Sequence, residues 1–175
     1  ANKGLTTLQM KYMGLQQNNA QDAFTTDSAA GGSALATGER HDNRHISMSS
    51  EGEPYPSLSD FFHDKGMPVG VLTLGNVADA TPTAFYGHSV ERDNADELTR
   101  CLMDGRVDLL CGSGIREFTR RSDGVDLIGE LKKQYDFVRS VDEINARKGK
   151  VICIDETMDD AAEQANLTLL ADATK

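Results

Sequence analysis

The sequence has little of what marks a membrane-spanning or disulfide-rich protein. No apolar run approaches the roughly 18 residues that a spanning helix needs, and the first residues show no signal-peptide pattern. The cysteines Cys101, Cys111 and Cys153 lie far apart without a Cys-x-x-Cys pair, which argues against a zinc ribbon and a dense disulfide framework. We expect a soluble chain with no membrane partner, in which the cysteines are packing residues or idle thiols.

Positive charge is also scarce, since 18 Lys and Arg stand against 28 Asp and Glu, a net charge of −10. Such a field repels nucleic acid and anionic lipid, so neither is an expected partner. A phosphorylated substrate would need positive charge at one place, from metal ions or an aimed arginine. Proline is rare, with 4 residues, and 38% of the chain is hydrophobic, which indicates a globular protein.

Helical patterns alternate with short apolar runs, which predicts an α/β fold. Helices are expected to open at four capping residues: Ser57, Asn94, Ser140 and Thr157. Buried strands are expected over three ranges: 69–74, 107–111 and 150–154. The last helix runs toward Lys175 without a stop signal, and no strand precedes Leu5. We therefore expect one domain, residues 1–175, that is incomplete at both ends.

The segment from Thr25 to Gly38 predicts a helix with Ser28 in its first turn. Small residues follow Ser28 almost without interruption, and Gly38 stands where a C-terminal cap is expected. Unpaired N–H groups and the positive helix dipole could hold a phosphate bonded to Ser28. The alternative is that Asp27 and Ser28 merely cap the helix. As a nucleophile, Ser28 would need a base or a metal ion to lose its proton.

A second segment, Asp79-Ala80-Thr81-Pro82, follows the first buried strand. Loops at the carboxyl ends of such strands carry the sites of α/β folds. Asp79 and Thr81 alternate along the loop, so two hard oxygens could face one cation such as magnesium. Arg92, further along, offers a planar fork that matches two phosphate oxygens. Taken alone, the Asp-x-Thr-Pro pattern is also compatible with a plain turn.

Together the two segments resemble the alkaline phosphatase family. Asp-Ser-Ala-Ala, Ala-Thr-Gly, Asp-Ala-Thr-Pro, a histidine and an arginine four residues beyond it occur in the family's order. The resemblance implies a role for each matching residue: Ser28 is the phosphorylated nucleophile, Asp27 orients the arginine, Arg92 clamps the substrate phosphate, Asp79 and Thr81 bind magnesium, and His88 is structural.

For the whole chain, the resemblance implies a three-layer α/β sandwich with a mostly parallel central sheet. It implies a phosphomonoesterase that works by double in-line displacement on small phosphate monoesters. In that scheme Ser28 attacks phosphorus, and zinc-bound hydroxide later hydrolyses the phosphoserine, with two zinc ions in the site and magnesium in support. The resemblance also suggests a periplasmic or secreted protein whose parent forms a homodimer.

The family's zinc ligands are largely missing from this sequence. It has no Asp-Gly-Met loop, no Asp-x-x-x-His spacing and no Asp-His dipeptide. We interpret this as truncation and expect the chain alone to be inactive. His41 and His45 have the i, i+4 spacing of helical metal ligands, but their polar surroundings favour a solvated loop. Gly112-Ser113-Gly114 is expected to be a structural turn rather than a phosphate cradle.

Two other functions remain open from the sequence. A relative with the same fold could hydrolyse a phosphodiester or a sulfate ester, although the Asp27-Ser28 pair and Arg92 favour a monoesterase. Alternatively, the chain could be a non-catalytic scaffold or interaction domain that retains the motifs as relics.

Overall fold

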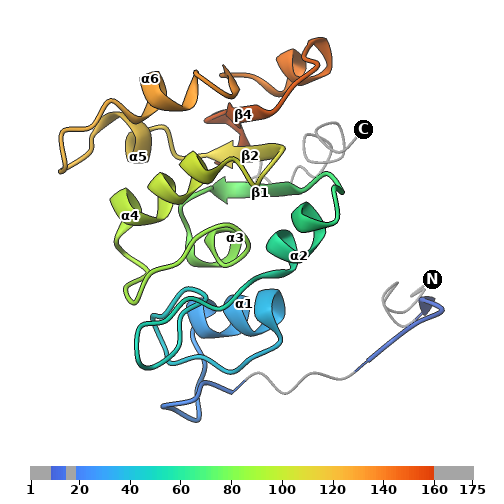
Figure 1. The fold of residues 1–175 in the computed structure, drawn as a ribbon, viewed down its shortest axis with the longest axis vertical. Helices are drawn as coiled ribbons and strands as arrows, with labels where there is room; N and C mark the ends of the chain where they lie inside the picture. The colour runs from blue at the N-terminus through green and yellow to red at the C-terminus, as the bar shows by residue number, and fades with distance from the viewer. Residues whose placement is uncertain (1–8, 15–18, 160–175) are drawn as a thin grey trace, which may run out of the picture.

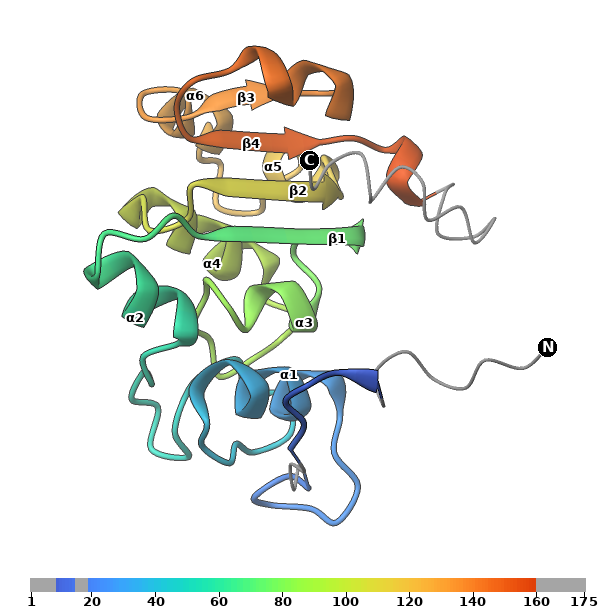
Figure 2. The same ribbon diagram turned by 90° about the vertical axis from the view of Figure 1, so that its right-hand side faces the viewer.

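The fold is built on a parallel four-stranded sheet, seen in a computed structural model that describes residues 9–14 and 19–159. The strand order is β1-β2-β4-β3. The strands are β1 (Gly70–Asn76), β2 (Leu109–Ser113), β3 (Asp136–Val138) and β4 (Val151–Ile154). Figure 2 shows β1, β2 and β4 side by side and pointing the same way. The predicted α/β fold with a parallel sheet is confirmed, and β3 is a strand that the sequence did not predict.

Both faces of this sheet are buried. In β2 and β4, Leu110 and Ile152 point into one hydrophobic cluster, whereas Cys111 and Cys153 point into another. Burial on two faces is typical of parallel sheets, whose strands read as apolar runs without alternation. Cys111 and Cys153 are fully buried free thiols, as expected for packing residues.

Helices cover one face of the sheet (Figure 1). They are α4 (Ala95–Arg100), which continues as the 3-10 helix η2 (Cys101–Asp104), α5 (Arg116–Thr119) and α6 (Leu127–Leu131). Leu102, Leu127 and Leu131 from these helices are buried against the strands. On the other face lies η3 (Val141–Ala146), a 3-10 helix where the sequence predicted a short helix after Ser140. The predicted last helix beyond Thr157 lies mostly outside the described residues.

The remaining helices lie beyond β1, in the lower half of Figure 1. They are α1 (Ser28–Thr37), α2 (Leu58–Asp64), which begins with the predicted Ser57 capping box, and α3 (Ala80–Thr83). The small residues of α1 allow α3 to approach closely. A Cβ atom on Gly32 would lie 3.3 Å from the Thr81 Cα. This contact brings the Ser28 segment and the Asp79 segment together.

Candidate active site

Ser28 is the first residue of α1 and is exposed. Asp27 precedes it as the N-cap, with an extended backbone and an Oδ1 that accepts the Ala30 N–H at 2.8 Å. Gly38 ends the helix with a φ of 80°, a conformation that glycine adopts without strain. The predicted helix start and stop are confirmed, and the Ser28 hydroxyl stands at the positive end of the helix dipole.

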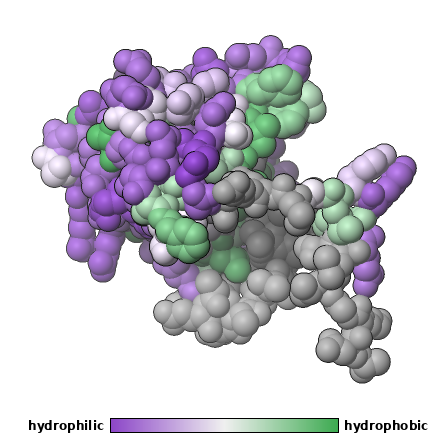
Figure 3. Space-filling model, turned by 90° about the horizontal axis from the view of Figure 1, so that it is seen from below, coloured by the Kyte–Doolittle hydropathy of each residue, from purple (hydrophilic) through white to green (hydrophobic). Residues whose placement is uncertain are grey.

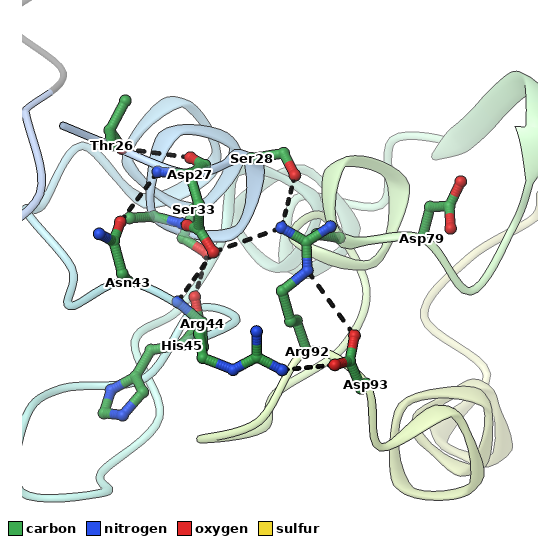
Figure 4. Close-up of polar contacts among 12 residues, drawn as sticks. Thr26, Asp27, Ser28, Ser33, Asn43, Arg44, His45, Asp79, Arg92 and Asp93 are labelled. Carbon is green, nitrogen blue, oxygen red and sulfur yellow. Dashed lines mark hydrogen bonds and ion pairs between the residues drawn. The ribbon is translucent and has the colours of Figure 1, made fainter.

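Arg92 joins Ser28 and Asp27 from a loop far along the chain (Figure 4). Its Nη1 donates to Ser28 Oγ at 2.7 Å and to Asp27 Oδ2 at 3.3 Å. Figure 4 shows the second amino group of Arg92 on the side that faces Asp79. The structure thus assembles three of the predicted site residues around one guanidinium group.

Asp27 is held from several directions. Its Oδ2 also accepts the Arg44 N–H at 3.0 Å, and its own N–H donates to Asn43 Oδ1 at 2.9 Å. Burial by itself would raise the pKa of Asp27, but the hydrogen bonds from Ala30, Arg44 and Arg92 together lower it below its usual value. The carboxylate therefore stays ionised and keeps Arg92 in place.

Asn43 and Arg44 were not recognised from the sequence as site residues. They follow Gly38 in a polar stretch, where asparagine is an ordinary turn residue. Nothing in that pattern reveals that Asn43 contacts Asp27, which lies 16 positions earlier in the chain.

Asp79 is also an N-cap, of α3, but its carboxylate makes no capping hydrogen bond. The predicted loop is wrong in detail, because the chain turns into a helix at Ala80 and Thr81 lies exposed in the first turn. The side chain of Asp79 reaches the surface, yet partial desolvation raises its pKa, as do the charges of Asp159 and Glu117, while Arg92 opposes the shift.

Asp159 adds a second carboxylate near Asp79. A Cβ atom on Gly75 would lie 3.6 Å from Asp79 Oδ2 and 4.0 Å from Asp159 Oδ1. Carboxylate oxygens are ligands that magnesium prefers, and no capping hydrogen bond occupies those of Asp79. Within residues 9–14 and 19–159 no third His, Cys, Asp or Glu side chain joins them in a metal-binding group, so these two carboxylates would supply only part of the ligands of a magnesium ion.

The described residues do not fit the zinc ions that the family resemblance implies. Within residues 9–14 and 19–159, no three His, Cys, Asp or Glu side chains gather in a way that could hold a metal ion. His41 is 1% exposed, so the expected solvated loop is wrong at this residue. Its ring nitrogens lie 2.8 Å from Thr37 Oγ1 and 2.8 Å from Met48 O, which commits both of them. His88, from its Nδ1, contacts Ser47 O at 3.0 Å.

The turn from Gly112 to Gly114 is a packing feature, as predicted. A Cβ atom on Gly112 would lie 2.7 Å from side-chain atoms of both Thr73 and Val77. Gly114 has a φ of 99°, and its N–H donates to Glu156 Oε1 at 3.0 Å. This turn requires glycine for close packing and for a left-handed backbone, and a protein carboxylate already occupies its N–H group.

The overall charge of the chain does not attract an anion. In Figure 3 the coloured surface of the face seen from below is mainly hydrophilic, with hydrophobic residues in separate groups. With a net charge of −10, phosphate binding depends on local charge such as that of Arg92. Among the described residues, none of the helices combines the length and the hydrophobicity that a membrane span requires.

The chain is similar in sequence to known phosphatases. The chain is 30% identical over 128 residues to alkaline phosphatase 4 of Bacillus subtilis, covering 69% of this chain and 28% of that protein. It is 38% identical over 87 residues to the streptomycin-6-phosphate phosphatase of Streptomyces griseus, covering 48% of this chain and 19% of that protein.

The fold is likewise similar to that of a solved alkaline phosphatase, from the Antarctic bacterium TAB5. The TM-score is 0.86 at 23% identity, covering 98% of this chain and 52% of that one. A mutant of that enzyme, His 135 Glu, is described with magnesium bound in its M3 site. The chain therefore spans about half of the solved structure and less than a third of the Bacillus subtilis protein. Residues 2–153 match the family model of alkaline phosphatase, and the chain belongs to the alkaline phosphatase family.

Proposed function

We propose that this chain carries the phosphate-binding site of a metal-dependent phosphomonoesterase in which Ser28 is phosphorylated. The observation that carries the proposal is the bridge from Arg92 to both Ser28 Oγ and Asp27. A guanidinium group held against a serine hydroxyl at a helix start suits the capture of a phosphoryl group next to its acceptor.

In the proposed first step, Ser28 Oγ attacks phosphorus in line with the departing ester oxygen. The Oγ–H proton passes to solvent water, the Oγ–P bond forms as the ester P–O bond breaks, and the departing alkoxide takes a proton from water. Arg92 binds non-bridging phosphate oxygens and stabilises the charge that develops on them. Its charge, 2.7 Å from Oγ, also favours ionisation of the hydroxyl.

Asp27 orients Arg92 and does not serve as the base. Its carboxylate already accepts hydrogen bonds from Ala30, Arg44 and Arg92, and its pKa is lowered. A carboxylate with a low pKa and committed oxygens is a poor proton acceptor. In the described part of the chain, the hydrogen bond to Ser28 Oγ comes from Arg92 and no general base contacts it.

Asp79, together with Thr81 and its neighbour Asp159, would hold magnesium. A bound magnesium ion supplies positive charge beside the phosphate and orders water molecules around it. Arg92 presents its second amino group toward Asp79, so a phosphate between them would meet positive charge on two sides (Figure 4). The described residues do not assemble a zinc site, and we expect negligible turnover from this chain alone.

The test is made on the complete protein that carries this chain, with an aryl phosphate as substrate. Ser28→Ala should lower turnover by several orders of magnitude and abolish the phosphoserine peptide in acid-quenched enzyme. Ser50→Ala, at another exposed serine, is the matched control and should change neither. A phosphoenzyme that persists in Ser28→Ala contradicts the proposal, and faster turnover of a phosphodiester or sulfate ester points to the related hydrolases.

Arg92→Ala separates phosphate binding from the nucleophile. Losing a charged, two-pronged contact should raise the inhibition constant of inorganic phosphate by about 10- to 100-fold. An unchanged inhibition constant means that Arg92 does not bind phosphate.

A further inference from the structure

Arg44 combines an unfavourable backbone with unusually well-placed contacts. In the described part of the chain, Arg44 and Ser47 are the two non-glycine residues with a positive φ, 70° and 47°. This left-handed conformation disfavours side chains with a Cβ atom. At Arg44 it points the main-chain N–H at Asp27 Oδ2, 3.0 Å away. A glycine would make that backbone contact with less strain, so the arginine side chain calls for a separate explanation.

The Arg44 side chain binds both residues that flank Arg92. Its Nε donates to Glu91 Oε2 at 3.0 Å and its Nη2 to Glu91 Oε1 at 2.5 Å. The same Nη2 donates to Asp93 Oδ2. Figure 4 shows Asp93 between the two arginines, with its other oxygen, Oδ1, 4.0 Å from Arg92 Nε.

Arg92 therefore lies between two carboxylates that could pair with it, Asp27 on the Ser28 side and Asp93 on the other. Arginine pairs best with a carboxylate through two parallel hydrogen bonds, and Asp93 is near enough to offer them after a small rotation. Such a pair would draw Arg92 Nη1 away from Ser28 Oγ, which it now contacts at 2.7 Å. Arg44 engages Glu91 and Asp93 Oδ2, which leaves Asp93 with only Oδ1 directed at Arg92.

We propose that Arg44 is a positioning residue, which keeps Arg92 directed at Ser28 by holding Glu91 and Asp93. This inference rests on the proposed function, since it assigns Arg92 to the phosphate. Arg44 itself touches neither Ser28 nor the place of the reacting phosphate. Its side chain and those of Glu91 and Asp93 are 51%, 44% and 72% exposed, so the ion pairs add little to stability and removing them leaves the fold intact.

The test compares variants of the complete protein by the inhibition constant of inorganic phosphate. Arg44→Gln should raise it about threefold to tenfold, since coupling within a charge network is of that size. Arg44→Gly relieves the backbone strain, so it should keep the melting temperature while weakening phosphate binding as much as Arg44→Gln. Arg44→Lys, a point charge without a fork, should fall between the parent and Arg44→Gln.

The decisive variant adds Asp93→Asn to Arg44→Gln. Removing the competing carboxylate should restore the parental inhibition constant, which a merely structural role of Arg44 would not allow. Arg92→Ala is the reference. If Arg92→Ala weakens phosphate binding and Arg44→Gln does not, or if Asp93→Asn gives no rescue, Arg44 is not a positioning residue. If Arg92→Ala itself has no effect, it is the proposed phosphate site that fails.

Discussion

Asp27 and Asp79 stand at the same point of two helices, but their carboxylates have opposite surroundings. Both are N-cap residues with extended backbones, at φ −90° and ψ 178° for Asp27 and φ −64° and ψ 156° for Asp79. Asp27 accepts hydrogen bonds from Ala30, Arg44 and Arg92, whereas Asp79 makes no cap bond. Accordingly the pKa of Asp27 is lowered and that of Asp79 is raised.

The difference separates a carboxylate that fixes its neighbours from one that is proposed to bind a cation. A carboxylate with every oxygen committed fixes its neighbours, and Asp27 fixes Arg92 and the Asn43–Arg44 turn. A carboxylate that is partly desolvated and short of protein donors gains from a cation. One residue type in one helical position is thus committed to structure at Asp27, whereas at Asp79 its surroundings suit the cation ligand proposed above.

The sharpest way to break the comparison is a magnesium titration. Asp79→Asn should weaken magnesium binding at least about tenfold, because it removes a charged oxygen ligand. Calorimetry on the complete protein measures this without relying on activity. Asp27→Asn is the matched control and should leave magnesium affinity unchanged, since its carboxylate is committed to Ala30, Arg44 and Arg92. Equal losses in the two variants would show that both carboxylates serve the metal.

The free energy of unfolding should depend more on Asp27 than on Asp79, the reverse of magnesium affinity. Asp27→Ala removes a helix cap and the acceptor of the Arg44 and Arg92 contacts, so it should lower the free energy of unfolding by about 1 to 2 kcal/mol. Asp79→Ala removes no cap bond and relieves a desolvated charge, so its effect should be near zero or slightly stabilising. Urea denaturation of the metal-free chain measures both, and a larger loss for Asp79→Ala would reverse the comparison.

Local signals in the sequence predicted much of the structure around Asp27. Asp27 before a run of small residues, and Gly38 after it, identify a helix start and stop because capping depends on neighbouring residues. The sequence did not predict that Asn43 and Arg44 contact Asp27, because these contacts form only when a later loop folds back onto the helix start. That Arg92 lies beside Ser28 was expected only from the family resemblance.

On the Asp79 side, the sequence favoured a loop and the chain forms a helix. Pro82 suggested a turn, but proline is tolerated in the first turn of a helix, where its missing N–H has no partner to lose. The strand β3 was missed for another reason. Asp136–Val138 is only three residues long, too short to show a periodic pattern, and it is defined by pairing with β4.

The smallest expected effect concerns His41, which contacts the end of α1 and the loop after it. Burial lowers the pKa of His41, and the neighbouring His45 adds to this, whereas the bond to Met48 and the charges of Glu39 and Asp42 oppose it. A lowered pKa means that the unfolded chain binds the proton more tightly. The stabilising effect is therefore fully present above pH 6.5, the usual value, and is lost as the pH falls toward the lower folded-state pKa.

We therefore expect the melting temperature of the chain to fall between pH 7 and pH 5 more steeply than in His41→Gln, which carries no titrating group at this position. Hydrogen exchange should locate the loss in α1 and the loop after it, because His41 contacts Thr37 and Met48. The Thr83 and Ala84 amides at the end of α3, which donate to Asp79 O and Ala80 O, should keep their protection. Parallel pH profiles in the two proteins would show that His41 does not couple protonation to folding. Equal loss of protection in α1 and α3 would show instead that the two sides of the site unfold as one unit, which the close contact of Gly32 with Thr81 would then explain.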